Sequence, residues 1–321
     1  MRSCAGNCSW TVRCWDFDSA RRSTVGENGT AKFAIVKYRR QMIQLRLVKK
    51  DFPEIEFDLP GATVRTVRHG AVAEDEWGCY ALLKGIAPDD LSAPPRQQAL
   101  CAFQVLEREL REAGMEFSDV VRTWIFADGI LGWYSDFNKA RDEFFSSRGV
   151  YDRYVPASTG IGWTNGLGAR LVLGAFAVKA KRPGDVVFEA LPSPLQCPAL
   201  EYGSSFSRAA EVRTPGWTRV VVSGTASIEP CSHEVAHVGD IDAQISCTMD
   251  AVRAIYESRG FSLGDISGAL VYLKEERYRA NWESWLDAHP EYPRGHSRAI
   301  VADVCRDEWL FEIESDAFKW K

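Results

Sequence analysis

The last strand of the chain has an alternating pattern of apolar and polar residues. The segment WLFEIES, residues 309–315, places apolar side chains on one face and two glutamates, Glu312 and Glu314, on the other. The two carboxylates are then roughly 7 Å apart. Because an unpaired charge is costly to bury, such glutamates need a partner or a chemical role. Two interpretations are open here: an ion pair at a subunit or domain seam, or a catalytic acid.

The hydrophobic pattern of the chain also repeats itself. Residues 97–126 and 244–272 each contain a helix with apolar residues at helical spacing, then a glycine, a turn with an acidic residue and an apolar strand. Gly114 aligns with Gly260, at a position where the end of a helix favours a left-handed residue. Each repeat predicts the order β, α, β, α, β, with additional strands at its start.

The two repeats differ at the glutamates. The last strand of the first repeat, residues 169–181, matches residues 307–319 of the second. The positions near Leu173 and Gly174 that correspond to Glu312 carry no acid. The fold therefore does not require a carboxylate at this place.

Two such repeats in tandem predict an α+β protein, in which each unit is a mixed sheet covered by helices on one face. A proline-rich segment near residues 183–198 marks the boundary. We divide the chain into an N-terminal extension (1–58), a first unit (59–183) and a second unit (184–321). Residues 1–30 lack periodicity and a signal-peptide core, and we expect them to be a loose leader.

Composition excludes several classes of protein. The chain is 45% hydrophobic and 26% charged, as is usual for soluble globular proteins. Its net charge of -5 gives no reason to expect nucleic acid or a membrane surface as partner. No apolar run approaches the roughly 20 residues that cross a bilayer. Nine cysteines, mostly scattered, favour free thiols in a reducing compartment, and we expect a cytoplasmic location.

The sequence offers little that would hold a metal or a cofactor. His233 and His237 are four residues apart but lie in a predicted loop, and the group formed by Cys4, Cys8 and Cys14 has no matching second group. There is no glycine-rich phosphate loop and no Ser-His-Asp signature. We therefore expect neither a metal nor a cofactor.

Several motifs of the second unit resemble the RidA/YjgF family, whose small α+β subunits assemble as trimers. They occur in the family's order: SGTASI (223–228), VYLK (271–274), HSRAIVADV (296–304) and LFEIES (310–315). Three further loops narrow the resemblance: YSDFNKARDEFF (134–145), YVPASTGIG (154–162) and EYGSSFSRA (201–209). Together with the tandem repeat they resemble the chorismatases, over roughly residues 60–321. The resemblance implies two RidA/YjgF-like (chorismate-mutase-like) units.

What the resemblance implies is a cofactor-free enzyme that hydrolyses the enolpyruvyl ether of chorismate and releases pyruvate. Glu312 matches the first glutamate of the family's last strand, which faces the substrate cleft. A carboxylic acid with a raised pKa can protonate the terminal methylene of the enol ether. Glu314 is a weaker candidate for this acid, and its like charge could help to keep Glu312 protonated.

Chorismate carries two carboxylates, which favour bidentate guanidinium partners. Arg298 is the first candidate, because it occupies the family's carboxylate-binding position, and Arg141 and Arg208 follow it. A surface position is the alternative for each arginine. The remaining predicted substrate-binding residues are Tyr134, Tyr202, Thr159 and Gly160. We expect Thr159 and Gly160 to belong to a glycine-rich turn that approaches the ligand closely.

Two positions are expected to tune the product. Water attack on the oxocarbenium ion gives 3,4-dihydroxycyclohexa-1,5-dienoate, whereas displacement by the ring hydroxyl gives a hydroxybenzoate. Cys305 resembles the hydroxybenzoate-forming chorismatases, and Ala226 resembles the hydrolytic type. We favour 3-hydroxybenzoate, because a cysteine can take part in proton transfer. The dihydrodiol and 4-hydroxybenzoate are the alternatives, and a small buried filler is the alternative role for Cys305.

Two further functions stay open at this point. The pair of Arg298 and Glu312 also suits an enamine or imine deaminase of the RidA type. A non-catalytic ligand-binding protein could keep the fold, and Glu312 would then be dispensable. The sequence allows either a monomer or a homotrimer.

Overall fold

The structure is a computed structural model. It describes residues 9–16, 41–49, 52–60, 63–230, 232 and 234–321, the first three of these ranges through their backbone alone.

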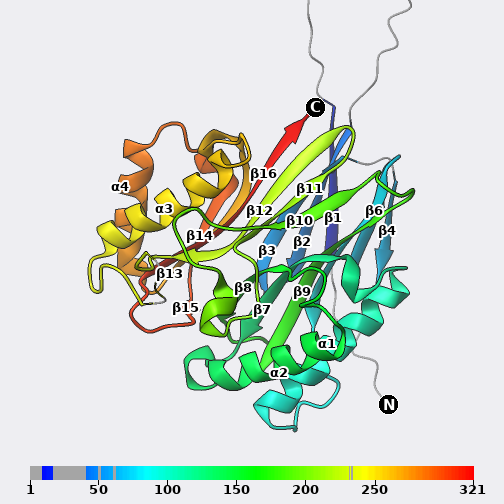
Figure 1. The fold of residues 1–321 in the computed structure, drawn as a ribbon, viewed down its shortest axis with the longest axis horizontal. Helices are drawn as coiled ribbons and strands as arrows, with labels where there is room; N and C mark the ends of the chain where they lie inside the picture. The colour runs from blue at the N-terminus through cyan, green and yellow to red at the C-terminus, as the bar shows by residue number, and fades with distance from the viewer. Residues whose placement is uncertain (1–8, 17–40, 50–51, 61–62, 231, 233) are drawn as a thin grey trace, which may run out of the picture.

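Both repeats fold into the same kind of unit (Figure 1). The first unit consists of β4 (Thr63–Val67), β5 (Gly70–Glu74), β6 (Gly78–Ile86), α1 (Pro95–Glu112), β7 (Val120–Ala127), α2 (Tyr134–Ser147), β8 (Ala157–Gly162) and β9 (Leu171–Ala180). The second unit consists of β10 (Val187–Leu191), β11 (Ala209–Arg213), β12 (Trp217–Ala226), α3 (Ile241–Glu257), β13 (Ile266–Leu273), α4 (Arg279–Ala288), β14 (Ser297–Val301), β15 (Asp303–Val304) and β16 (Phe311–Trp320).

The strand order is the same in the two units. It is β8-β7-β9-β6-β5-β4 in the first sheet and β14-β13-β16-β12-β11-β10 in the second. In each sheet the strand after the second helix is parallel to its neighbour, and the other pairs are antiparallel. The predicted tandem α+β fold is therefore confirmed. The order predicted for each repeat omitted β8 and β14, because these strands are short and β8 contains two glycines.

The core has three parts, because each sheet packs on both faces. Trp124 of β7 and Trp217 of β12 lie in the core between the two sheets. Phe103 of α1 packs with the outer face of the first sheet, and Trp282 of α4 packs with the outer face of the second. The two helix pairs therefore lie on the outer faces of the sheets, away from the seam between them (Figure 1).

Strand β8 joins the units. Asp303 and Val304 of β15 pair with its free edge, so the second unit adds a strand to the first sheet. At the same strand the Ser158 amide donates to Ser223 Oγ at 2.9 Å, and the Gly224 amide donates to Oγ1 of Thr159 at 3.0 Å. The edge of the first sheet is thus covered by backbone and side chains of the second unit.

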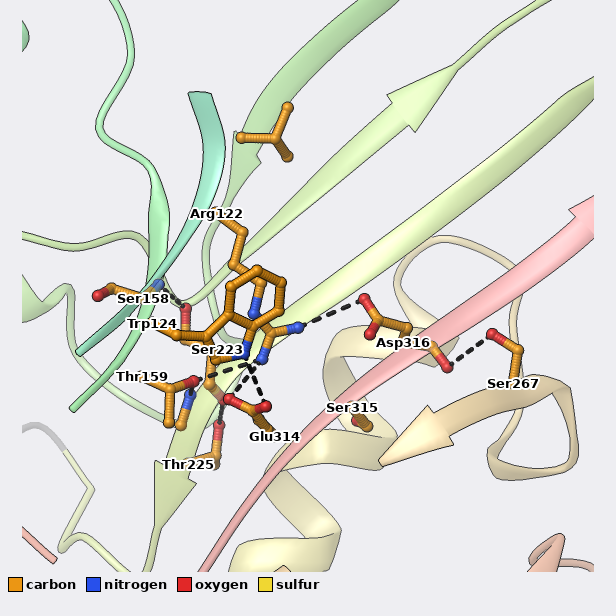
Figure 2. Close-up of polar contacts among 12 residues, drawn as sticks. Arg122, Trp124, Ser158, Thr159, Ser223, Thr225, Ser267, Glu314, Ser315 and Asp316 are labelled. Carbon is orange, nitrogen blue, oxygen red and sulfur yellow. Dashed lines mark hydrogen bonds and ion pairs between the residues drawn. The ribbon is translucent and has the colours of Figure 1, made fainter. Parts of the chain in front are cut away.

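A buried ion-pair network crosses the same seam (Figure 2). Arg122 of β7 is fully buried, with Nη2 2.8 Å from Oε2 of Glu314 and Nη1 3.3 Å from Oδ1 of Asp316. Trp124 Nε1 donates to Oε1 of Glu314 at 2.8 Å, and Arg122 Nη2 donates to Oγ1 of Thr159 at 3.3 Å. Glu314 therefore forms an ion pair at the seam between the units. This was one of the two interpretations of the glutamates in the last strand.

The last strand is longer than its alternating pattern predicted. Phe311 and Ile313 pack under the helices of the second unit, as expected from the alternation. Trp309 precedes β16 and instead joins the core between the sheets, because strand alternation does not extend into the preceding turn.

The pairing of the strands also corrects which residues of the two repeats correspond. The pairing of β16 with β12 and of β9 with β6 aligns Trp320 with Ala180, so Val172 corresponds to Glu312 and Gly174 to Glu314. The first unit still has no acid at either position.

Three strands precede the first unit: β1 (Ser9–Asp16), β2 (Gln41–Lys49) and β3 (Phe52–Pro60) form a separate antiparallel sheet. Part of the predicted loose leader is thus a strand, in line with the strand propensity of its aromatic and β-branched residues. The rest of residues 1–30, with Cys4 and Cys8, lies outside the described residues.

Two further expectations concern the compartment. The cysteines whose side chains the structure describes are free thiols: Cys79, Cys101, Cys197, Cys247 and Cys305. Among the described residues, no helix has the length and apolar character needed to cross a membrane.

We predict that Arg122→Met lowers the free energy of unfolding by about 3–5 kcal/mol, because Glu314 would be left buried without its cation. Urea denaturation of the purified protein measures this loss. The matched control is Arg182→Met, since Arg182 is 74% exposed and water screens its ion pair with Asp185, so the loss should be small. A loss for Arg122→Met no larger than that of the control would contradict the role of the network.

Candidate active site

A cavity that opens to solvent lies at the seam between the units, and the empty space there is about 580 Å³, open solvent included. Its walls come from α2 and β8 of the first unit and from the loop before β11, the end of β12, the turn before β16 and β16 itself. The predicted site residues that line it are Glu312, Arg141, Arg208, Tyr134, Tyr202, Gly160, Cys305 and Ala226. These positions lie on several elements of both units, and the fold brings them to one place.

Two predicted residues do not line the cavity. Arg298 lies exposed on β14, the edge strand of the second sheet, and β13 separates that strand from β16. Thr159 is buried in strand β8, so the prediction of a glycine-rich turn there was wrong. Because side chains alternate along a strand, Ser158 and Gly160 face the cavity, whereas Thr159 accepts hydrogen bonds within the seam.

Glu312 is the acid of the cavity. It lies on β16, with Ala226 of β12 and Tyr272 of β13 as its Cα partners, and it is 4% exposed. No residue that the structure describes donates a hydrogen bond to its carboxyl. Burial, reinforced by the charge of Glu314, raises the pKa of Glu312 to about 8, and Arg208 opposes this in part. Glu312 is therefore protonated at neutral pH.

Gly224 makes room for this carboxyl. A Cβ atom at position 224 would lie 2.1 Å from Oε1 of Glu312 and 3.0 Å from Cγ2 of Thr159. Only glycine leaves space for the carboxyl in this position. Gly224 was not singled out from the sequence, although a glycine inside a strand pattern indicates a close approach of this kind.

Two arginines of the cavity have no carboxylate partner within the described part of the chain. Arg141 of α2 is 2% exposed and donates from Nη2 to Oδ1 of Asn138 at 2.7 Å. Arg208 is 3% exposed and donates from Nε to the Cys197 carbonyl at 2.9 Å. Nε of Arg141 and Nη2 of Arg208 are buried without a hydrogen-bond partner. Because burial of unpaired cations is costly, this arrangement favours an anionic ligand.

The tyrosines and the cysteine that line the cavity are neutral. Burial raises the pKa of Tyr134, of α2, and that of Tyr202, in the short 3₁₀-helix Ala199–Tyr202. Burial and the charge of Glu312 raise the pKa of Cys305 to about 12, although Tyr134 opposes this in part. Cys305 therefore lines the cavity as a thiol and not as a thiolate.

Sequence reasoning missed several residues that line the cavity. Arg306 follows Cys305 directly, and strand alternation would point the two to opposite faces; the chain turns here, so both face the cavity. The Arg306 guanidinium lies 5.1 Å from the ring of Trp309. The other missed residues are Phe137, Ser158, Ser204, Phe206, Gly224, Ile228 and Trp309. Most of these are apolar or small, and no sequence pattern sets them apart from core residues.

Only one of the two histidines considered for metal binding lies within the described residues. His233 lies outside the described residues, and His237 has a φ of 56°, in the left-handed region. Among the described residues, no group of three or more His, Cys, Asp or Glu side chains could hold a metal ion.

Two comparisons show which known proteins this chain is similar to. A chorismatase from Streptomyces rapamycinicus is 30% identical over 225 residues, which cover 62% of this chain and 64% of that protein. A crystal structure of a chorismatase superposes with a TM-score of 0.64 at 18% identity, and covers 97% of this chain and 98% of that one. The chain is thus similar in sequence to chorismatases and shares the fold of one.

Other relatives are similar to parts of the chain. A chorismatase from Streptomyces hygroscopicus is 26% identical over 224 residues, or 61% of this chain and 60% of that protein. A RutC family protein from Pyrococcus horikoshii is 32% identical over 101 residues, or 30% of this chain and 77% of that protein. The chain thus spans less than two thirds of either curated chorismatase that it matches. No family model matches the sequence.

We predict that Glu312→Gln stabilises the protein at alkaline pH. The pKa of Glu312 rises from 4.5 to about 8 on folding, so stability is full below about pH 4.5 and declines as the pH rises to about 8. Glutamine removes this decline. Urea denaturation should show the variant a few kcal/mol more stable than the wild type at pH 9, and nearly equal to it at pH 4.5.

The control for this prediction is Glu308→Gln, because Glu308 is exposed in the turn before β16. It should leave the pH dependence of stability unchanged. A difference between Glu312→Gln and the wild type that is the same at both pH values would contradict the raised pKa.

Proposed function

We propose that the protein cleaves the enolpyruvyl ether of chorismate and releases pyruvate, with Glu312 as the general acid. The observation that carries this proposal is a buried, protonated carboxyl in the same cavity as two buried arginines without carboxylate partners. Chorismate needs one proton at carbon and offers two carboxylates. The two Streptomyces relatives are chorismatases, and this similarity supports the same substrate.

The proposed first step is proton transfer from Glu312 to the terminal methylene carbon of the enolpyruvyl group. A C–H bond forms, the double bond is lost, and the positive charge develops on the ether carbon as an oxocarbenium ion. The glutamate formed is then close to this cation and stabilises it. A positioned general acid accelerates such a step about 10²–10⁴-fold. Arg141 and Arg208 would bind the substrate carboxylates.

The second step decides the product. If water adds to the oxocarbenium carbon, the adduct collapses to pyruvate and the dihydrodiol acid. If the ring hydroxyl displaces pyruvate, the ring then loses a proton and becomes aromatic, and pyruvate and hydroxybenzoate together contain all the atoms of chorismate. We propose 3-hydroxybenzoate, with the dihydrodiol and 4-hydroxybenzoate as the competing outcomes. Ala226, the strand partner of Glu312, and Cys305 both line the cavity where this choice is made.

The alternative functions have less support. A deaminase of the RidA type was inferred from Arg298 together with Glu312, but Arg298 lies on exposed β14 and does not line the cavity. A non-catalytic binding protein would leave the raised pKa of Glu312 without a use. The cytoplasmic location and the choice between monomer and homotrimer stay predictions.

We predict that the purified protein converts chorismate to pyruvate and that Glu312→Gln lowers kcat about 10²–10⁴-fold, because glutamine cannot give up the proton. Coupled pyruvate detection measures the rate. Quenching of the protein's fluorescence as chorismate is added should show that the variant still binds substrate. For the wild type, kcat/KM should fall above about pH 8, where the acid loses its proton. Absence of pyruvate from the wild-type reaction would refute the proposed function.

We predict that Cys305→Ala and Ala226→Gly each change the ratio of hydroxybenzoate to dihydrodiol, because both side chains line the cavity beside the acid. Chromatography of the products gives the ratio, and total pyruvate gives the rate of the first step. Cys247→Ala is the control, since this thiol lies on α3 outside the cavity. Product ratios equal to that of the wild type would show that neither position tunes the outcome.

A further inference from the structure

Two carboxylates share one face of β16 and have different surroundings. Glu312 and Glu314 are two residues apart, so they lie roughly 7 Å from one another on the side that faces the first sheet. Each is 4% exposed. Glu312 faces the cavity, whereas Glu314 accepts a hydrogen bond from Trp124 and forms an ion pair with Arg122, both on β7 of the first unit (Figure 2).

We propose that Arg122 is a positioning residue for the acid: by holding Glu314 as a carboxylate beside Glu312, it keeps the proton on Glu312. This inference rests on the proposed function and adds to it a role for the first unit. Ionisation of Glu312 would place a second negative charge next to one that is already fixed. Glu314 cannot relieve the repulsion by taking up a proton without breaking its ion pair with Arg122.

The same arginine also supports the space that the acid occupies. Nη2 of Arg122 donates to Oγ1 of Thr159, and this oxygen also accepts from the Gly224 amide. Gly224 is the residue whose missing side chain leaves room for the carboxyl of Glu312. Arg122 therefore acts on the acid by two routes, through the charge of Glu314 and through the position of Gly224.

Other charged or titratable groups also face the acid, and none replaces Glu314. Arg208, before β11, lowers the pKa of Glu312 and so opposes protonation. Burial raises the pKa values of Tyr272, of β13, and Cys305, so both are neutral near pH 8. The remaining groups lining the cavity are Tyr134, Arg141, Tyr202 and Arg306. Glu314 is thus the charged neighbour that favours the acid form.

The network occurs once in the two units. The repeats align Arg122 with Gly268, since β7 and β13 have the same offset from the preceding turn. The positions that match the two glutamates are Val172 and Gly174. The first unit therefore supplies the cation and the second supplies both acids, so neither unit could form this arrangement with a copy of itself.

The test compares Glu314→Gln with Asp316→Asn. Each removes one acid from Arg122 and leaves the other in place, and a glutamine can still accept from Trp124, so both variants should fold with reduced stability. The alkaline limb of the pH profile is the range in which kcat/KM falls because the acid loses its proton. In Glu314→Gln this limb should lie about one to two pH units lower, as expected for charges roughly 7 Å apart at an effective dielectric constant of about 20–40. Asp316→Asn should leave this limb in place. Equal limbs in the two variants would reduce Arg122 and Glu314 to a structural role and overturn the proposal.

A titration that does not depend on turnover separates this inference from the proposed function. Carbon-13 NMR of glutamate-labelled protein follows the Glu312 carboxyl, assigned with Glu312→Gln, and its midpoint should fall by the same one to two pH units in Glu314→Gln. An unchanged midpoint would overturn the inference even if chorismate is cleaved.

Discussion

One buried arginine sets the geometry at which the two sheets meet. Arg122 has no access to solvent, so its charge must be balanced by protein groups, and Glu314 and Asp316 of β16 supply the balance. The two acids are spaced by one strand period, which fixes both the register and the facing of β16 against β7. A shift of one residue would bring Ser315 to the arginine and turn Glu312 away from the cavity. The position of the acid therefore depends on an ion pair that does not touch the cavity.

The two glutamates of β16 have identical side chains but different roles, because their surroundings differ. Glu314 has a cation and an indole N–H within hydrogen-bond distance, so its charge is compensated. Glu312 has the same low exposure but no hydrogen-bond donor among the described residues, and its charged form is disfavoured. The two initial interpretations of the strand, an ion pair and an acid, turn out to describe one residue each.

Local patterns predicted the fold well, and distant contacts limited the prediction of the site. The repeat, the helices and the last strand follow from periodicity, which is a property of neighbouring residues. The partner of Glu314 could not be found in this way, because Trp124 and Glu314 are 190 positions apart and no pattern joins them. Arg298 was chosen from its place in a motif, and Arg306 was missed because only the turn after β15 brings it into the cavity. Strand β8 was taken for a turn because its serine, threonine and glycines are typical of turns.

The two residues of β15 have a consequence for the first unit as a separate protein. Asp303 and Val304 pair with the outer edge of β8, which would otherwise present unpaired amides and carbonyls. A fragment that ends after β9 would expose this edge together with the apolar inner face of its sheet. Such a fragment would present a template for strand addition, and we expect it to aggregate. Two residues near the far end of the chain thus protect the first half of the protein from self-association.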